Sequence, residues 1–297
     1  MNLAYIISAY KLPEQLVRLV ARLNTDASHF VIHVDEKSDD AVFEPIATAL
    51  EPLSNVRLLE RHRCDYGGFG HVRATLKGIT ELVRLGLPFD YVILLTGQDY
   101  PIKSNERIAE FFREHRGQSF LDYFSLPSDG WKGGGTDRFE SWHLRLRGRH
   151  VRIPRRHATS LLRRRIPLGL RPFGGSPYWC LSRACIEYVA AFVERSPSYV
   201  RFFRFVDVPD EIFFHTILLN SPLRGELVND DLRYVEWRDP EVAGGPALLG
   251  TPDLEKVMSS TSLFARKFDI TFDADVLDLI DARIEEDERS ASSFAGR

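Results

Sequence analysis

Cysteine is scarce in this sequence, and long apolar runs are missing from it. The three cysteines, Cys64, Cys180 and Cys185, are an odd number without the paired spacing of a zinc site. We therefore expect reduced thiols and a reducing compartment. No apolar run approaches the roughly 18 residues that span a bilayer, and no signal peptide precedes the first apolar run at 3–8. These absences predict a cytoplasmic protein.

Charge of neither sign predominates, because 39 lysines and arginines face 42 aspartates and glutamates, for a formal net charge of −3. This balance argues against a general nucleic-acid binder, so we expect no nucleic-acid partner. The charge is nevertheless uneven, since ten arginines fall from Arg145 to Arg171 inclusive, within a stretch, 131–172, that has little periodicity. We interpret 131–172 as an insertion: either a solvated loop, or a lid or docking face for an anionic partner. A docking face would place the protein peripherally at the inner face of the membrane.

Nucleotide-binding fingerprints are absent too, since the glycines before residue 71 match neither a P-loop nor the dinucleotide spacing. Present instead are short apolar runs at 3–9, 30–34 and 56–59, with helical spacing at 16–23 between the first two. A further run at 91–95 has the composition of a buried strand. This alternation predicts a single α/β domain built on a parallel sheet.

Polar residues follow several of these predicted strands. In a parallel α/β sheet, ligands lie beyond the carboxyl ends of the strands, so Ser8, Tyr10 and Asp35 should meet at that edge. Asp99, soon after the run at 91–95, is predicted to reach the same edge. Single carboxylates there would accept hydrogen bonds from ribose or sugar hydroxyls. The alternative, a divalent ion on Asp35 or Asp99, lacks a close second carboxylate in a metal-binding pattern.

The acidic stretch 207–211 precedes an apolar segment with helical spacing at 212–219. Asp207 is predicted to cap this helix, and Pro209 to lie in its first turn. Glu211 then falls near the positive end of the helix dipole, which favours the ionised carboxylate that a general base needs. The alternative is that these acids only stabilise the start of the helix.

Two tryptophans belong to predicted strands in the second half of the chain. Trp179, in the run Pro-Tyr-Trp at 177–179, either stacks on a sugar or fills the core. Trp237 ends an alternating run at 232–237. We interpret the last residues, 273–297, as an acidic helix and tail, in which Asp273 and Asp275 hold surface charge rather than a metal ion.

Four motifs, taken in order, resemble a known family. They are Asp-Tyr-Gly-Gly at 65–68, Leu-Leu-Thr-Gly-Gln-Asp-Tyr-Pro-Ile-Lys-Ser at 94–104, Val-Pro-Asp-Glu-Ile-Phe-Phe-His-Thr at 208–216 and Leu-Phe-Ala-Arg-Lys-Phe-Asp at 263–269. Together they are similar to the core-2/I-branching β-1,6-N-acetylglucosaminyltransferases, a family that includes the peptide O-xylosyltransferases. Each motif alone is weak, but the similarity runs from residue 33 to residue 269.

The resemblance implies a GT-A type, Rossmann-like glycosyltransferase domain over residues 1–272, with a mixed, mainly parallel central sheet. It implies inverting transfer of N-acetylglucosamine or xylose from a UDP-sugar to a hydroxyl of a glycan or other acceptor. Glu211 matches the family's catalytic base, Lys267 the basic residue that holds the diphosphate, and Trp237 an acceptor-site aromatic. A protein cation at Lys267, helped by Arg266, would replace the metal ion of most GT-A enzymes, so no metal or other cofactor is expected. The alternative is that both side chains are simply solvated.

The other predicted site residues are assigned from strand ends and motif positions. Predicted nucleotide contacts are Ser8, Asp35, Tyr66 and Asp99, and predicted acceptor contacts are Asp210, Trp179, Glu140 and Arg145. Two rival hypotheses are a metal-dependent transferase and a non-catalytic protein that binds a nucleotide-sugar or an anionic surface.

The chain departs from the animal members of this family in two respects. Their amino-terminal membrane anchor and their disulfides are not evident here, which favours a bacterial member. Their second phosphate-binding cation has no counterpart at 241–250. Either Arg238, Lys256, Arg266 or an arginine of 131–172 replaces it, or the phosphate is held more weakly.

Overall fold

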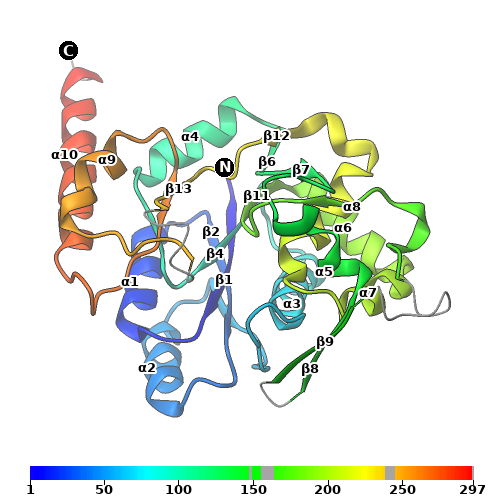
Figure 1. The fold of residues 1–297 in the computed structure, drawn as a ribbon. Helices are drawn as coiled ribbons and strands as arrows, with labels where there is room; N and C mark the ends of the chain where they lie inside the picture. Colours follow the sequence, from blue (N-terminus) through cyan, green and yellow to red (C-terminus); the bar gives the residue numbers. More distant parts are fainter. Residues whose placement is uncertain (147–148, 155–163, 238–244, 296–297) are drawn as a thin grey trace.

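The computed structural model describes residues 1–146, 149–154, 164–237 and 245–295, with a seven-stranded sheet at its centre (Figure 1). The strand order is β12 (Leu227–Asn229), β6 (Ser119–Leu121), β11 (Trp179–Ser182), β4 (Tyr91–Thr96), β1 (Leu3–Ala9), β2 (Ser28–Val34) and β3 (Val56–Leu58). In this sheet β11 runs antiparallel to its neighbours β4 and β6, whereas the other pairs are parallel. The predicted mixed, mainly parallel α/β sheet is confirmed.

Helices cover both faces of this sheet (Figure 1). One core is shared by α1 (Pro13–Leu23), α2 (Asp40–Leu50), α4 (Asn105–Glu114), α9 (Leu254–Ser259) and α10 (Val276–Ala295), and the other by α3 (Gly70–Arg84), α6 (Arg183–Arg195), α7 (Pro197–Phe203) and α8 (Phe213–Leu219). Successive residues of β1 alternate between these cores, because Tyr5 and Ile7 pack into the first, and Ala4 and Ile6 into the second. Gly78 lets α3 approach closely, since a Cβ atom there would lie 2.9 Å from the Ile6 side chain.

Local sequence signals explain where several helices begin. Ser104 caps α4, because its hydroxyl accepts a hydrogen bond from the backbone N–H of Arg107 at 3.1 Å. Asp39 caps α2 in the same way through the backbone N–H of Val42. Pro13 occupies the first turn of α1, where its missing N–H costs no hydrogen bond.

The acidic end of the chain forms α10, in agreement with the helix predicted there, but this helix also contributes to the core. Val276, Ile280 and Ile284 are buried in the same core as α1. Asp273 starts the helix, since its Oδ1 accepts hydrogen bonds from the backbone N–H groups of Asp275 and Val276. The interpretation of Asp273 as plain surface charge therefore missed its structural role.

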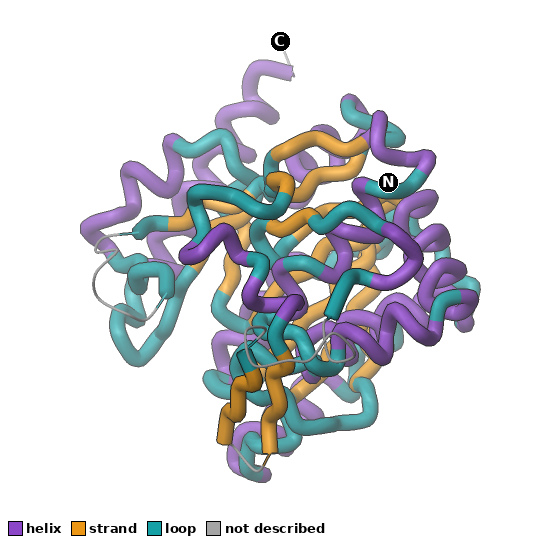
Figure 2. Tube along the Cα trace, turned by 45° about the vertical axis from the view of Figure 1, so that its right-hand side comes forward, coloured by secondary structure: helices purple, strands orange, loops and turns teal. Residues whose placement is uncertain are grey.

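Smaller sheets surround the central one. They are β13 (Arg233–Val235) with β14 (Phe264–Arg266) and β5 (Asp99–Pro101), β10 (Phe173–Gly174) with β7 (Phe124–Ser125), and the hairpin β8 (Trp142–Leu146) with β9 (Arg149–Ile153). Figure 2 shows this hairpin extending from the body of the molecule. Short helices are η1 (Lys132–Gly135), α5 (Asp137–Glu140), η4 (Pro167–Gly169), η5 (Pro209–Glu211), η6 (Pro222–Glu226) and η7 (Thr251–Asp253).

The segment 131–172 contains more regular structure than its weak periodicity predicts, namely η1, α5 and the β8–β9 hairpin. Every residue of β9 is exposed, which explains why no buried pattern marks this strand in the sequence. Arg147, Arg155, Arg156 and Arg163 lie outside the described residues, so an anionic docking face stays a prediction. None of the helices that the structure describes has both the length and the apolar character needed to cross a bilayer.

Candidate functional site

A cavity of about 1220 Å³ opens at the carboxyl ends of the central parallel strands. Ser8, His33 and Thr96 line it, and these residues are direct neighbours in the register of β1, β2 and β4. Other parts of its wall come from the irregular segments after β10 and before α8. The cavity therefore lies at the edge of the sheet where the sequence predicts ligands.

Eight of the predicted site residues line this cavity. They are Ser8, Asp35, Tyr66, Asp210, Glu211, Trp237, Arg266 and Lys267. Glu211 and Lys267 thus share one cavity, as the predicted mechanism requires. The other predicted residues, Asp99, Trp179, Glu140 and Arg145, are not among its lining residues.

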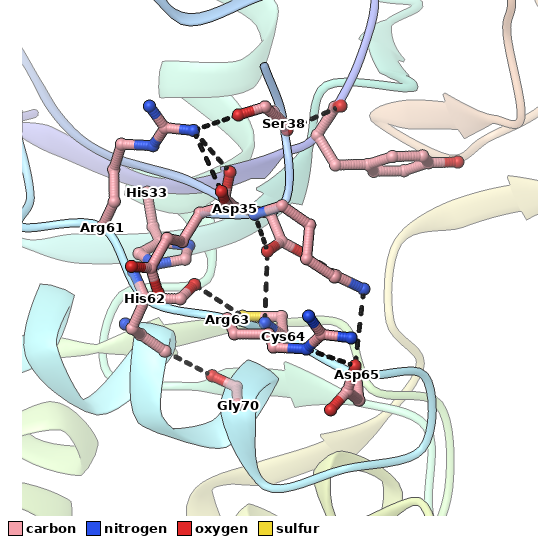
Figure 3. Close-up of polar contacts among 12 residues, drawn as sticks. His33, Asp35, Ser38, Arg61, His62, Arg63, Cys64, Asp65 and Gly70 are labelled. Atoms are coloured by element: carbon pink, nitrogen blue, oxygen red, sulfur yellow. Dashed lines mark hydrogen bonds and ion pairs between the residues drawn. The ribbon is translucent and has the colours of Figure 1, made fainter. Parts of the chain in front are cut away.

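Asp35 is held firmly at the end of β2 (Figure 3). Its Oδ1 accepts hydrogen bonds from the backbone N–H groups of Lys37 at 2.9 Å and Cys64 at 3.2 Å, and the Lys37 Nζ lies 3.5 Å from Oδ2. The Arg61 guanidinium donates to the backbone carbonyls of Asp35 and Ser38. One carboxylate oxygen of Asp35 is therefore committed to the backbone, and the loop that carries it is pinned.

His33, His62 and Cys64 form a buried cluster beside Asp35 (Figure 3). The Nε2 atom of His33 accepts from the backbone N–H of His62 at 3.2 Å, and Nε2 of His62 lies 3.0 Å from the carbonyl oxygen of Gly70. Burial lowers the pKa of His33 to about 4 and raises the pKa of the Cys64 thiol to about 12. The imidazole rings, with centroids 4.1 Å apart, therefore pack as neutral groups beside a protonated thiol.

Three cationic side chains lie at the end of the cavity near β14. They are Lys11, Arg266 and Lys267, and all three line the cavity. The Arg266 guanidinium lies over the ring of Tyr178 at 4.1 Å, and Lys11 Nζ is 2.5 Å from Asp269 Oδ2. Burial, followed by the charges of Arg266 and Lys11, lowers the pKa of the Lys267 ammonium. A bound anion such as a diphosphate would relieve this repulsion between like charges.

The predicted contact between Asp99 and the nucleotide does not fit the position of this side chain. Its side chain is fully buried, and Oδ2 accepts hydrogen bonds from the backbone N–H and the hydroxyl of Thr96, both at 2.6 Å. Its Oδ1 lies 3.4 Å from Nε of Arg266. Because β5 begins at Asp99, the chain turns this carboxylate away from the cavity, where it orients Arg266.

The sequence predicts that Glu211 lies in the first turn of an α-helix, and the structure contradicts this. It ends the 3-10 helix η5, and α8 begins only at Phe213. Asp207 is not a cap, because its carboxylate pairs with Arg145, and the residue before η5, Val208, has a left-handed backbone with φ of 46°. The dipole of α8 therefore does not account for an ionised Glu211. An ion pair favours the ionised carboxylate instead.

Arg138 supplies that ion pair, and the sequence interpretation missed it. Its guanidinium bonds to the Glu211 carboxylate and lies over the ring of Trp131 at 3.7 Å. Burial raises the pKa of the Glu211 carboxyl, and Arg138 opposes that rise. Both Arg138 and Trp131 line the cavity, but they belong to a segment whose sequence has no periodicity to place them.

The backbone of Glu211 is also fixed. Its carbonyl oxygen accepts a hydrogen bond from the N–H of Gly175 at 3.0 Å. Gly175 is itself pressed against the chain, since a Cβ atom there would lie 1.9 Å from the carbonyl oxygen of Asp122. No side chain fits at 175, and this explains the glycine in the sequence.

Asp210 and Trp237 complete the predicted residues of the cavity wall. Oδ1 of Asp210 is buried without a hydrogen-bond partner among the described residues, and burial raises the pKa of this carboxyl. The Trp237 side chain is 64% exposed at the rim, so its ring surface is available to a ligand. Arg238 lies outside the described residues, and Lys256 is exposed away from the cavity lining. Lys11, which the sequence analysis did not name, lines the cavity together with Arg266 and Lys267.

The remaining predicted acceptor residues lie outside the cavity lining. Trp179 is fully buried in the central strand β11 and packs against Phe214, so it belongs to the core. Arg145 donates from Nε to the carbonyl oxygen of Tyr66 at 2.9 Å and supports the Tyr66 loop from outside the cavity. Glu140 ends α5 and does not reach the cavity lining.

Comparison with known proteins agrees with the resemblance carried by the four motifs. A family model described as core-2/I-branching enzyme matches residues 3–258. Xylosyltransferase 2 of Mus musculus and that of Homo sapiens are each 28% identical over 300 residues, covering 94% of this chain and 33% of the relative. Xylosyltransferase 1 of Homo sapiens is 27% identical over 240 residues, covering 80% of this chain and 24% of the relative.

This chain spans about one third of the length of the xylosyltransferase 2 relatives. The matched region includes strands β1, β2 and β4, whose ends line the cavity, and the segment that carries Glu211, but it stops before Lys267. Because the family match extends over most of the chain, this protein belongs to the core-2/I-branching enzyme family.

Proposed function

We propose that this chain is an inverting glycosyltransferase that works without a metal ion and uses Glu211 as its general base. It transfers xylose or N-acetylglucosamine from a UDP-sugar to a hydroxyl of a glycan or other acceptor. One observation carries the proposal: a carboxylate of raised pKa, Glu211, and three cations, Lys11, Arg266 and Lys267, line one cavity. Xylosyltransferase relatives favour xylose as the first donor to test.

The acceptor hydroxyl is a weak nucleophile until a positioned base takes its proton. Glu211 accepts this proton as the hydroxyl oxygen attacks the anomeric carbon of the donor. The bond from that carbon to the diphosphate breaks with its electron pair, so UDP leaves on the opposite face and the configuration inverts. Burial makes Glu211 a stronger base than an ordinary glutamate, while the Arg138 guanidinium favours its ionised form.

The departing diphosphate gains negative charge, which a low-dielectric site must stabilise. Lys267 and Lys11 place ammonium groups at this end of the cavity, and Asp99 orients the Arg266 guanidinium beside them. Asp230 and Asp231 also line the cavity, but each accepts a hydrogen bond from the backbone two residues further on. The cations therefore offer the more direct means of neutralising the leaving group.

The test is a transfer assay with UDP-xylose and UDP-N-acetylglucosamine against a panel of glycans and hydroxyl-containing peptides. Released UDP and the mass of the product report transfer, and NMR of the new linkage reports the anomeric configuration. We expect transfer to proceed without added Mg²⁺ or Mn²⁺, and Glu211→Gln to lower kcat at least about 100-fold with UDP binding retained.

Glu194→Gln is the matched control, because Glu194 is an exposed glutamate of α6 that does not line the cavity. Near-normal transfer by Glu211→Gln, or a product that retains the donor configuration, would contradict the proposal. UDP binding without transfer to any acceptor would instead favour a nucleotide-sugar binding protein.

A further inference from the structure

Two histidines and one aspartate converge outside the cavity, behind the segment that carries Glu211. His143 belongs to β8, His150 to β9, and Asp207 lies shortly before η5. One nitrogen from each ring and one carboxylate oxygen all lie within 4.8 Å of one another. None of the three side chains lines the large cavity, so the proposed transfer reaction does not use them.

The two imidazoles are spaced as they would be around one metal ion. Nδ1 of His143 lies 3.0 Å from Nε2 of His150, and the ring centroids are 5.2 Å apart. A tetrahedral zinc ion with Zn–N bonds of about 2.0–2.1 Å separates its ligand nitrogens by about 3.3 Å. The hairpin therefore already holds one edge of such a site close to the required length.

The hydrogen bond on the far side of His143 prepares its ring as a ligand. Nε2 of this buried ring lies 3.0 Å from the backbone carbonyl oxygen of Asp137, which can only accept, so Nε2 carries the hydrogen. Nδ1 therefore presents a lone pair toward His150 and Asp207. A histidine whose second nitrogen donates to a carbonyl is the usual arrangement around a protein-bound metal ion.

The hairpin register brings the second histidine to the same face. Arg145 is paired with His150, and His143 with Arg152, so His143 and His150 are diagonal neighbours across the two strands. Asp207 uses Oδ1 to pair with Arg145 and makes no described hydrogen bond through Oδ2. That second oxygen completes a set of two imidazoles and one carboxylate.

We propose that His143, His150 and Asp207 form a structural site for one divalent ion of the zinc class, with water as the fourth ligand. Two imidazoles and one carboxylate are a ligand set that suits Zn²⁺. The ion would fasten the β8–β9 hairpin to the chain that leads into Glu211. The prediction that no metal takes part in the reaction concerns the diphosphate, which binds elsewhere.

The ion's position matters because its ligands are bonded to both sides of the Arg138–Glu211 pair. The backbone N–H of Asp207 donates to the carbonyl of Arg138 at 2.9 Å, and that of His143 donates to the carbonyl of Phe205 at 3.1 Å. Losing the ion would loosen these segments while leaving Lys11, Arg266 and Lys267 in place. Chelator would then reduce activity without any metal at the diphosphate.

Cobalt titration of the metal-stripped full chain tests the site directly. We expect one equivalent of Co²⁺ to bind with the visible absorption of a tetrahedral nitrogen and oxygen site, Zn²⁺ to displace it, and Zn²⁺ to raise the Tm. His150→Gln should weaken binding at least about 10-fold. His150 is exposed, so this variant should fold, and His29→Gln on β2 is the matched control with unchanged binding.

Three results would overturn the site: no saturable Co²⁺ binding, equal binding by His150→Gln and the unaltered chain, or a sulfur-to-cobalt absorption band. The last result would place the ion at the cluster of His33, His62 and Cys64. These readouts do not depend on enzyme activity, so they stand whatever becomes of the proposed function.

An activity measurement distinguishes the structural metal site from the metal-independent transfer mechanism. This measurement rests on the proposed function. Chelator should lower transfer by the unaltered chain to the level of His150→Gln and have no further effect on that variant. If chelator abolished transfer by His150→Gln, the metal-independent mechanism would fail, whereas the cobalt result would stand.

Discussion

The two walls of the cavity are built in different ways. In the wall that we propose binds the nucleotide, here called the nucleotide wall, Ser8, His33 and Thr96 stand in register at the ends of three parallel strands. In the wall that carries the proposed base, Glu211 ends a short 3-10 helix that follows a left-handed residue, Val208. The first wall inherits its geometry from the sheet, whereas the second depends on individual contacts such as the Arg138 ion pair.

The walls also differ in charge, although burial acts on both. Burial lowers the pKa of Lys267 on one side and raises that of Glu211 on the other, because it disfavours the charged form of each group. A diphosphate would compensate the first group, and a hydroxyl proton would neutralise the second. Each wall therefore holds one partly desolvated charged group. The diphosphate would offset the cost of burying Lys267, and the acceptor proton would offset the cost of burying Glu211.

The largest expected effect on ligand binding concerns the cations Lys11, Arg266 and Lys267, which we assign to the nucleotide wall. Lys267→Ala removes an ammonium group that would bond a diphosphate, and a hydrogen bond to a charged group contributes about 1.5–3 kcal/mol. Calorimetry should therefore show UDP binding about 10–100-fold weaker. Lys256→Ala is the control, because Lys256 is exposed and outside the cavity lining. Unchanged UDP affinity in Lys267→Ala would remove the distinction between the walls.

A smaller effect, with a defined pH signature, is expected at the other wall. Arg138→Gln removes the cation that opposes the raised pKa of Glu211, so this pKa should rise further. The acid limb of kcat/KM against pH should then move to higher pH, since the base works only when ionised. We expect about a 10-fold loss at neutral pH, and no shift in Arg195→Gln on the exposed end of α6. A fixed acid limb would show that Arg138 does not control Glu211.

Trp237 sharpens the comparison further, because it is exposed at the rim and should contact the acceptor alone. Aromatic stacking contributes about 0.5–1.5 kcal/mol beyond buried area, so Trp237→Ala should raise the acceptor KM about 3–10-fold. The affinity for UDP should not change. A loss of UDP affinity equal to the rise in acceptor KM would assign Trp237 to the nucleotide wall.

The smallest effect is a gain in stability. Oδ1 of Asp210 is buried without a hydrogen-bond partner among the described residues, and burial raises the pKa of this carboxyl, so its ionised form costs stability above the folded pKa. Asp210→Asn should raise the Tm by about 1–3 °C at neutral pH while lowering transfer. This gain should shrink as the pH falls from the folded pKa toward the unfolded pKa, and it should vanish below the unfolded pKa, where the carboxyl is protonated in both states. Thermal unfolding at several pH values checks both the sign and the trend.

The nucleotide wall could largely be predicted from the sequence. Apolar runs mark β1, β2 and β4, and parallel register then brings Ser8 beside His33 and Thr96. This reasoning fails for Asp99. Its carboxylate follows a predicted strand and was therefore expected to reach the ligand edge of the sheet. The chain turns immediately into β5, so Asp99 bonds to Thr96 and Arg266 instead of facing the cavity.

The wall that carries the proposed base was harder to predict from the sequence, because its contacts join residues far apart in the chain. Arg138 and Glu211 are 73 residues apart, and Arg138 belongs to a segment without periodicity, so no local pattern connects them. The position of Glu211 was predicted from a helix start, but Val208 and η5 delay α8 beyond it. Trp179 could have been recognised as core only from strand order, because β11 lies between β4 and β6.

The cation cluster of Lys11, Arg266 and Lys267 has a practical consequence for work with this protein. Pyrophosphate, sulfate and phosphate buffers carry the same kind of charge as the donor and would occupy the same end of the cavity. Raising the ionic strength would screen these partly exposed ammonium groups and weaken donor binding more than acceptor binding. Apparent donor preferences measured in phosphate would therefore report on the buffer as well as on the sugar.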